Sequence, residues 1–359
     1  MGVLEGLRVV ELASSGGTGF CGMFLADLGA DVILIERPSD DVGRARPEAI
    51  QHRGKRSAVL DLAQSEAIGA VLQLIDRADA LIEGLQPGGM EHLGLGPEVC
   101  LARKPSLVYG RLTGEDETAC AAMSGALWIA SQPGVPAAAP NTLLGQVGGG
   151  ALYLTFGVLA ALLRAQSDGC GQIVDAAMVD GCANLLNMML GVVPSRDGKF
   201  DAIRANGYGR HWVRSYRCAD GEWVRVEPDE PQFYADLIRR LGLDNDERFI
   251  HGQENRKQWP QLAAELDALF ATKTRAQWCK LLEGSDACFA PVLSPIEAAR
   301  HPHNVARGIY QTVDGVLQAA PAPRFTATPS PSIHRVPPLG AHTRDVLREL
   351  RALGGTDAT

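Results

Sequence analysis

LRVVELASSGGTGFCGMFLADLGADVILIE, residues 7–36, sets the pattern of the fold. Its first part, Leu7–Ala13, is a short apolar run with β-branched residues, which predicts a buried strand. Apolar residues then recur at helical spacing over Phe20–Gly29 and end on a glycine, which predicts a helix. Ala30–Glu36 is a second strand-like run. A strand, a helix and a strand with almost continuously apolar strands indicate a parallel sheet covered by helices on both faces.

The same alternation continues through the first half of the chain, so we predict an α/β fold. Apolar residues 151–163 are fewer than the roughly 20 that cross a bilayer, and Thr155 and Gly157 interrupt them. We therefore interpret this segment as a core helix. Further strands are predicted within residues 57–62, 79–84 and 106–113, a helix within 65–78, and a strand followed by a helix within 171–190.

The second half of the chain has a different texture. Residues 192–211 are polar, contain glycines and lack periodicity, which is typical of a linker. A hairpin is predicted around Asp220-Gly221, and helical patterns follow at 231–241, 259–272 and 275–283. These features predict a second, smaller α+β unit. A proline-rich tract from 319 to 340 then leads to a closing helix.

Composition excludes some classes of function and compartment. The 359 residues carry a net charge of −8, which argues against non-specific binding to nucleic acid or to an anionic membrane. The eight cysteines are scattered and form no C-x-x-C pair. Because no secretory segment precedes the first predicted strand, we expect a reduced, cytoplasmic protein.

Gly17, Gly19 and Gly22 fit the spacing G-x-G-x-x-G between a predicted strand and a predicted helix. Glu36 closes the next strand about twenty residues later, as in nicotinamide-dinucleotide sites. In that interpretation the helix start binds a pyrophosphate and the carboxylate binds a ribose. The alternative is that the glycines only allow close packing at the strand-to-helix turn.

Several segments in one order along the chain resemble family III CoA-transferases, and among them the α-methylacyl-CoA racemase branch. They include HRGKRSAVLDL (52–62), LIEGLQPGGMEHLGLGPE (81–98), VGGGALYLTFGVLAALL (147–163), GQIVDAAMVDG (171–181) and SDACFAPVL (285–293). The resemblance implies an acyl-CoA substrate and no nicotinamide, which counts strongly against the dinucleotide interpretation.

The resemblance also implies an architecture. A large Rossmann-like domain comprises residues 1–190 and a C-terminal segment, 324–359, that returns to it. A small α+β domain, 214–308, is inserted through linkers at 191–213 and 309–323. Two chains interlock as a homodimer, and the active site lies between the large domain of one chain and the small domain of the other.

The site that this resemblance implies has lost its reactive groups. Racemisation at the carbon next to a thioester needs two acid/base groups and a stabilised enolate oxygen. The racemase branch has an aspartate in a G-D-x-G-G-G turn and a histidine upstream, and the transferase branch uses that aspartate as its nucleophile. Here the aspartate position is Gln146, and no histidine lies between Gly114 and Gly145. An amide can exchange hydrogen bonds but cannot take up a proton at neutral pH.

The contacts with CoA that the resemblance implies are only partly retained. Where the family has further basic residues, this chain has Gln86, His92 and Ala63. These losses favour a shortened carrier, a different carrier or none. The basic residues that stay candidates for phosphate or adenine contacts are Arg37, Arg53, Lys55, Arg56 and Arg111.

Other residues are weaker candidates for chemistry. Glu230 matches a family glutamate of the site, or it caps the helix predicted from Pro231. His211 lies at the junction of linker and small domain, where it either faces the site or packs. Cys120 is a conceivable nucleophile that lacks an identified base. The acids Glu115, Asp116 and Glu117 are typical of a solvated turn, with a catalytic role for one of them as the alternative. His301–Asn304 is typical of a surface loop rather than a metal site.

We therefore predict a diverged enzyme that acts on an acyl thioester or a related small carbonyl compound. Gln146 and the amides of the glycine turn would polarise an oxygen, and Glu230 or His211 would supply a proton step. The reaction would be of isomerase, lyase or cyclase type without metal or nicotinamide, and CoA would serve only as a substrate carrier. Two alternatives stay open: an ordinary racemase or CoA-transferase with substitute residues, and a non-catalytic homologue that binds a ligand.

Overall fold

Two compact units make up the described chain. The structure, a computed structural model, describes residues 2–13, 16–114, 116–131, 140, 142–191, 209–330 and 334–354. One unit lies within residues 1–130, 138–187 and 308–359, and the other within 131–137 and 188–307. The larger unit contains the candidate site.

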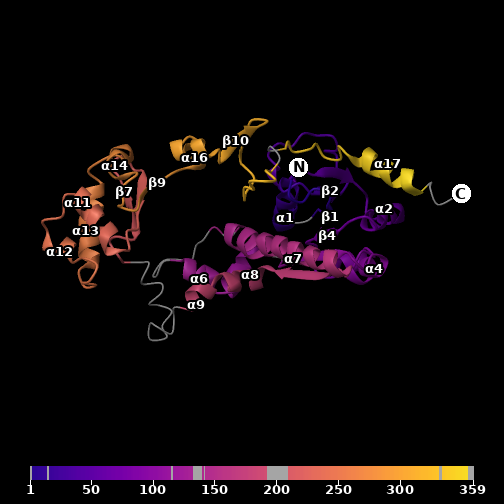
Figure 1. Ribbon diagram of the computed structural model, residues 1–359, viewed down its shortest axis with the longest axis horizontal. Coiled ribbons are helices and arrows are strands. Elements are labelled where there is room, and N and C mark those ends of the chain that lie inside the picture. The colour runs from indigo at the N-terminus through magenta and orange to yellow at the C-terminus, as the bar shows by residue number, and fades with distance from the viewer. Residues whose placement is uncertain are drawn as a thin grey trace. The chain divides into compact units, whose positions relative to one another are not determined.

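A six-stranded parallel sheet forms the centre of the larger unit (Figure 1). Its strand order is β3-β2-β1-β4-β5-β6, so the order reverses between β1 and β4. In doubly wound sheets, ligands bind outside the carboxyl ends of the strands at such a reversal. The predicted α/β fold with a parallel sheet is therefore confirmed. The strands are β1 (Arg8–Leu12), β2 (Asp31–Glu36), β3 (Arg56–Val59), β4 (Ala80–Glu83), β5 (Val108–Thr113) and β6 (Gln172–Ala177).

Helices cover both faces of this sheet. Neighbouring residues of a strand point to opposite faces, so the apolar strands present side chains to be buried on each face. Val10 packs in one buried cluster with Leu74 of α2 and Val346 of α17. Its neighbour Val9 packs in the other cluster, with Leu154 of α7. The helices of this part of the chain are α1 (Gly16–Asp27), η1 (Ile50–His52), α2 (Ser65–Ile75), α3 (Gly89–His92), α4 (Pro97–Arg103), α5 (Glu117–Met123), α6 (Ala126–Ala130), η2 (Thr142–Ala151), α7 (Leu152–Asp168), α8 (Met178–Leu185) and α17 (Thr343–Gly354), and α9 (Asn187–Leu190) spans the boundary with the smaller unit.

The glycine cluster folds as a helix rather than as the turn that the sequence predicts. Thr142–Ala151 forms a π-helix, η2, that continues directly into α7. Together they give one 27-residue helix whose most apolar window has mean hydropathy 1.6, long and apolar enough to cross a membrane by length and composition. Leu154 and Val158 on one side of it are fully buried, as in the core helix that the sequence predicts.

The smaller unit is α+β and has an aromatic core. Its antiparallel sheet has the order β7-β8-β9, and β7 and β8 form the hairpin predicted around Asp220-Gly221. Trp212, Tyr216 and Phe270 are among its buried residues. Its elements are β7 (Arg214–Arg217), β8 (Trp223–Val226), α11 (Pro231–Arg240), α12 (Glu247–Ile250), α13 (Trp259–Phe270), α14 (Arg275–Leu282), β9 (Phe289–Val292), α15 (Pro295–Ala298) and α16 (Pro302–Arg307).

The structure describes little of the first segment expected to be a linker, and it shows a hairpin in the second. Of the first, 191–213, residues 192–208 lie outside the described residues. The second, 309–323, contains an antiparallel hairpin of β10 (Tyr310–Val313) and β11 (Val316–Ala319). The turn residues between them are Asp314 and Gly315, both at positive φ. Asp-Gly is a typical signal of a two-residue hairpin turn, and the linker interpretation overlooked it.

Candidate functional site

Gln146 lies in η2 against the first turn of α1. A Cβ atom on Gly16 would stand 2.9 Å from Oε1 of Gln146, so the amide touches the first residue of that helix. The Gln146 side chain is half-buried. Within the described chain it makes no hydrogen bond. Its donor and its acceptor are therefore both free for a ligand.

The first turn of α1 adds further hydrogen-bonding groups. The leading N–H groups of an α-helix have no partner inside the helix. Thr18 belongs to this turn, its side chain is fully buried, and its Oγ1 lacks a partner among the described residues. A buried polar atom without a partner requires an explanation, such as a water or a ligand. The sequence prediction did not include Thr18, because a threonine between glycines carries no distinctive signal.

The glycines of η2 allow close packing of helices. A Cβ on Gly181 of α8 would stand 1.9 Å from the carbonyl oxygen of Gly149, and one on Gly145 would stand 2.6 Å from that of Glu117. In a π-helix each N–H group donates to a carbonyl five residues earlier. The amides of Gly148, Gly149 and Gly150 are thus used inside the helix, and the expectation that they polarise a substrate oxygen is corrected. The groups that remain available to polarise an oxygen are the Gln146 side chain and the N–H groups at the start of α1.

The G-x-G-x-x-G glycines also serve packing. A Cβ on Gly22 would stand 1.8 Å from Oε2 of Glu11, a buried carboxylate. Lys55 donates to both oxygens of Glu11, at 2.8 and 2.6 Å, and to the carbonyl of Gly19 at 2.9 Å. Glu36 accepts hydrogen bonds from Arg46. The close-packing interpretation is favoured, and the carboxylate expected on a ribose is already paired.

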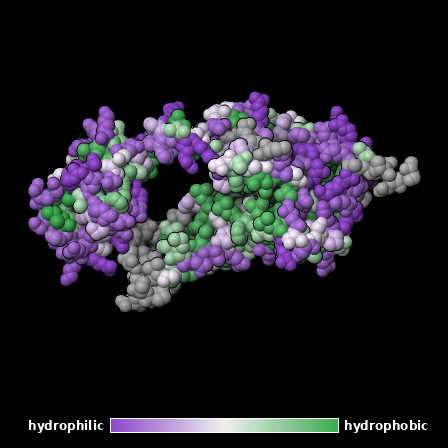
Figure 2. Space-filling view, viewed as in Figure 1, coloured by the Kyte–Doolittle hydropathy of each residue, from purple (hydrophilic) through white to green (hydrophobic). Residues whose placement is uncertain are grey.

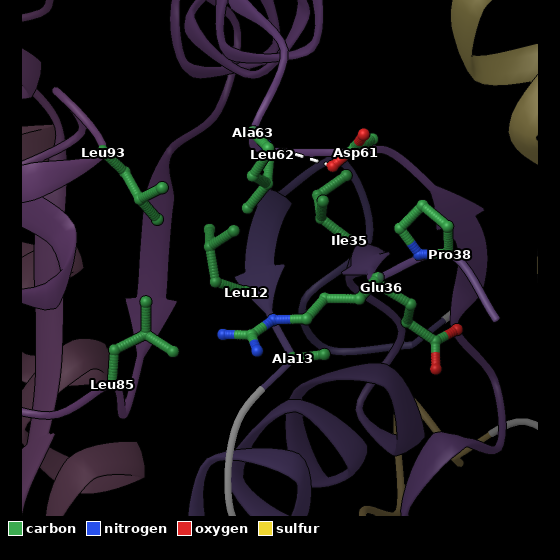
Figure 3. A pocket seen from close by; sticks show the side chains of 11 residues that line it. Leu12, Ala13, Ile35, Glu36, Pro38, Asp61, Leu62, Ala63, Leu85 and Leu93 are labelled. Carbon is green, nitrogen blue, oxygen red and sulfur yellow. Dashed lines mark hydrogen bonds between the residues drawn. The ribbon is translucent and has the colours of Figure 1, made fainter.

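A pocket of about 460 Å³ opens at the carboxyl ends of β1 to β4, where the strand order reverses. Figure 3 shows Leu85 and Leu93 on one side of it and Leu12 on the other, while the Glu36 carboxylate turns away from the cavity. Arg37 is the one cation among the described residues that line it. Ala63, where the resemblance expects a lysine, also lines the pocket. The lining comprises Leu12, Ala13, Ile35, Glu36, Arg37, Pro38, Asp61, Leu62, Ala63, Leu85 and Leu93.

The pocket and Gln146 are neighbours. Ala13 lines the pocket, and Gly16, three residues later, contacts Gln146. Since consecutive Cα atoms are about 3.8 Å apart, the two points on the chain are at most about 11 Å apart. One extended ligand could therefore occupy both.

Four of the five basic residues expected to contact CoA form internal ion pairs instead. Arg53 pairs with the buried Asp27, at 3.0 and 2.5 Å, and Lys55 pairs with Glu11 as described above. Arg56 begins β3, at the amino edge of the sheet, and pairs with Asp31 and Glu349. Arg111 pairs with Glu83 at 2.6 Å and Glu91 at 2.8 Å. Of the five, only Arg37 lines the pocket.

The remaining candidates from the sequence are placed as follows. His211 is fully buried in the smaller unit. Tyr234 donates to the carbonyl of Phe249, so His211 donates to Tyr234 through Nε2–H at 2.7 Å. Burial lowers the pKa of His211 to about 4. A neutral, enclosed imidazole does not suit proton transfer to a substrate. Glu230 is exposed and precedes α11 at its N-cap position, without a side-chain cap hydrogen bond.

Cys120 and the acidic residues lie around the start of α5. Cys120 is buried and desolvation raises its pKa, so it is a thiol and not a thiolate nucleophile. Asp116 caps α5 by accepting from the N–H groups of Thr118, at 2.7 Å, and Ala119, at 3.3 Å. Glu115 lies outside the described residues. The sequence prediction did not anticipate that Glu117 packs against Gly145, since nothing in the local pattern encodes that contact.

The histidines near residue 301 do not gather the ligands of a metal site. His301 contacts Glu283 at 2.8 Å, and α16 begins at Pro302. Within the described residues, no group of three or more His, Cys, Asp or Glu side chains could hold a metal ion.

Comparison with known proteins gives the family. The sequence profile of CoA-transferase family III matches residues 4–343. This chain is a member of CoA-transferase family III. The α-methylacyl-CoA racemase of Mus musculus is 38% identical over 97% of this chain and 93% of its own length. The succinyl-CoA–D-citramalate CoA-transferase of Chloroflexus aurantiacus is 28% identical over 99% and 95%. A family protein of Brucella suis shares the fold, with a TM-score of 0.82 at 23% identity over 97% and 99%. Family members with such names are enzymes, and this chain belongs to their superfamily.

Proposed function

We propose that this family III chain binds an acyl-CoA thioester, or a related carbonyl compound, and forms its enolate. The reaction is then of isomerase, lyase or cyclase type and uses neither a metal nor a nicotinamide. One observation carries the proposal: a free, half-buried amide, Gln146, stands against the start of α1, where the resembled enzymes have a carboxylate.

The chemistry follows from what an amide can do. Removing the proton next to a thioester carbonyl moves charge onto the thioester oxygen, and preorganised N–H donors stabilise that charge. Nε2 of Gln146 and the leading N–H groups of α1 provide such donors. Because a neutral amide cannot form an acyl anhydride under these conditions, the covalent route of CoA-transferases is not supported here.

The pocket at the carboxyl ends of β1 to β4 suits the nucleotide end of CoA. Its leucine, alanine and proline walls can enclose a flat aromatic ring, and Arg37 can pair with a phosphate. The thioester end would then extend past Ala13 toward Gln146. A nucleotide without a long acyl-bearing arm would fill only the pocket.

The Arg37→Ala variant is expected to bind CoA about 10- to 100-fold more weakly, since a charge-assisted hydrogen bond contributes roughly 1.5–3 kcal/mol. Isothermal titration with CoA measures this. Arg77→Ala is the matched control, because Arg77 is exposed and follows α2 at the opposite edge of the sheet. Equal affinities of both variants would place the nucleotide elsewhere.

The homodimer is supported by an uncovered apolar face. Leu152, Phe156 and Leu163 are exposed and lie along one side of α7. Figure 2 shows apolar side chains gathered over this part of the larger unit. Such contiguous exposed patches mark interaction sites. We infer that a second copy of the chain covers this face, as in the interlocked dimers of the family.

Incubation with 2-methylacyl-CoA in D₂O tests the proposed function. We expect deuterium at the carbon next to the thioester, detected by mass spectrometry, because enolate formation exposes that position to exchange. An ordinary racemase, the second candidate suggested by the similarity to the mouse enzyme, would also invert the configuration at the rate of exchange. Binding of the thioester without any exchange would favour the non-catalytic alternative.

A further inference from the structure

The acidic residue packed against Gly145, the neighbour of Gln146 in the sequence, has no role in the site described so far. We propose that Glu117 is the catalytic base that removes and returns the α-proton, an inference that rests on the proposed function. Glu117 is the first residue of α5. A Cβ on Gly145, the residue before Gln146, would stand 2.8 Å from Cβ of Glu117 and 3.1 Å from its Cα. The two segments are thus in direct contact.

Glu117 is also free to react. Its carboxylate forms no hydrogen bond or ion pair with the described residues, and it is half-buried. The neighbouring carboxylate of Asp116 is used as the cap of α5. Cys120 and Cys182, on the helices α5 and α8 that pack against η2, are buried thiols with raised pKa values. Glu117 is therefore a carboxylate in contact with η2 that is suited to carry a proton.

The proposed step balances without a further reactant. A carboxylate oxygen of Glu117 takes the α-proton, so the C–H bond breaks and an O–H bond forms. The electron pair moves to the thioester oxygen, where the Gln146 amide and the start of α1 hold it. Glu117 then returns the proton to the same carbon, or to another carbon of the conjugated enolate.

A base on one face of the carbon has a stereochemical consequence. Racemases place acid/base groups on both faces of the carbon, so that one removes a proton and the other delivers one. In the larger unit described here, Gln146 cannot act as the second group. Exchange should therefore retain configuration. This arrangement suits a double-bond shift, an elimination or a ring closure, and it does not suit racemisation.

The test compares Glu117→Gln with Asp116→Asn, which removes the adjacent charge but keeps a good helix cap. Deuterium exchange into (2R)- and (2S)-2-methylacyl-CoA, and affinity for the same thioester, are measured for each. Glu117→Gln should slow exchange about 100-fold or more, as for loss of a general base, with affinity within about twofold. Asp116→Asn should exchange within about threefold of the unmodified protein, and exchange should outpace epimerisation.

The possible contrary results separate the role of Glu117 from the proposed function. Exchange by Glu117→Gln at the unmodified rate overturns the role of Glu117 while the proposed function stands. Epimerisation as fast as exchange overturns the one-sided base. A protein that binds the thioester and exchanges nothing overturns both. Glu117→Asp guards against a folding defect: it should keep measurable exchange and the circular dichroism of the unmodified protein.

Discussion

Replacing Gln146 by alanine should slow α-proton exchange by about 10²- to 10³-fold, the usual effect of removing one oxyanion donor. A Cβ atom on Gly16 would stand 2.9 Å from Oε1 of Gln146, and the amide has no partner in the described chain. Its removal therefore disturbs no internal hydrogen bond of that part of the chain. The loss should appear in the rate of exchange at saturating thioester and leave affinity almost unchanged.

The control for this prediction is Gln166→Ala, a change of the same type at an exposed site near the end of α7. It should exchange at the unmodified rate. Gln146→Asp is informative in the other direction, because it restores a group that can accept a proton. We expect epimerisation to rise above background in that variant. If Gln146→Ala exchanges as fast as Gln166→Ala, the amide has no part in the reaction.

Lys55→Met should destabilise the larger unit by about 3–5 kcal/mol, the usual cost of breaking a buried ion pair by removing one partner. Lys55 and Glu11 are both fully buried, and the ammonium also binds the carbonyl of Gly19 in α1. Without the lysine, an unpaired carboxylate stays in the core beneath Gly22. Equilibrium denaturation in urea, followed by circular dichroism, measures the loss.

A second variant separates charge burial from packing. The double change Glu11→Leu with Lys55→Met removes both charges, so it should recover a large part of the lost stability. A single variant that loses less than about 1 kcal/mol, or a double variant no more stable than the single, would show that the pair is not desolvated as described.

The parallel sheet could be predicted because its strands are buried on both faces and leave continuous apolar runs. Val9 and Val10 show why, since they pack into opposite clusters. The π-helix over 142–151 could not be predicted in the same way. Locally, three consecutive glycines favour a turn. Contacts with α8 and α5, through Gly149 and Gly145, instead hold the segment in a helix.

The candidate site could be predicted only where one residue decides it. The sequence alone shows that Gln146 replaces a carboxylate. The structure adds that the amide is unpartnered within the described residues. Basic residues were harder to interpret, since their acidic partners are remote. Arg53 pairs across 26 positions with Asp27, and Arg56 across 293 with Glu349. A charge pattern alone could not separate these internal pairs from Arg37.

The most direct test of the account is the affinity of Gln146→Ala for an enolate mimic. A nitroalkyl thioether of CoA, as its nitronate anion, has the planar shape and charge of the enolate. The unmodified protein should bind the nitronate at least about 100-fold more tightly than the corresponding alkyl thioether, as for transition-state analogues. The Gln146→Ala variant should lose most of that preference and keep its affinity for the alkyl thioether. An equal preference in both proteins would contradict the claim that this amide stabilises an enolate.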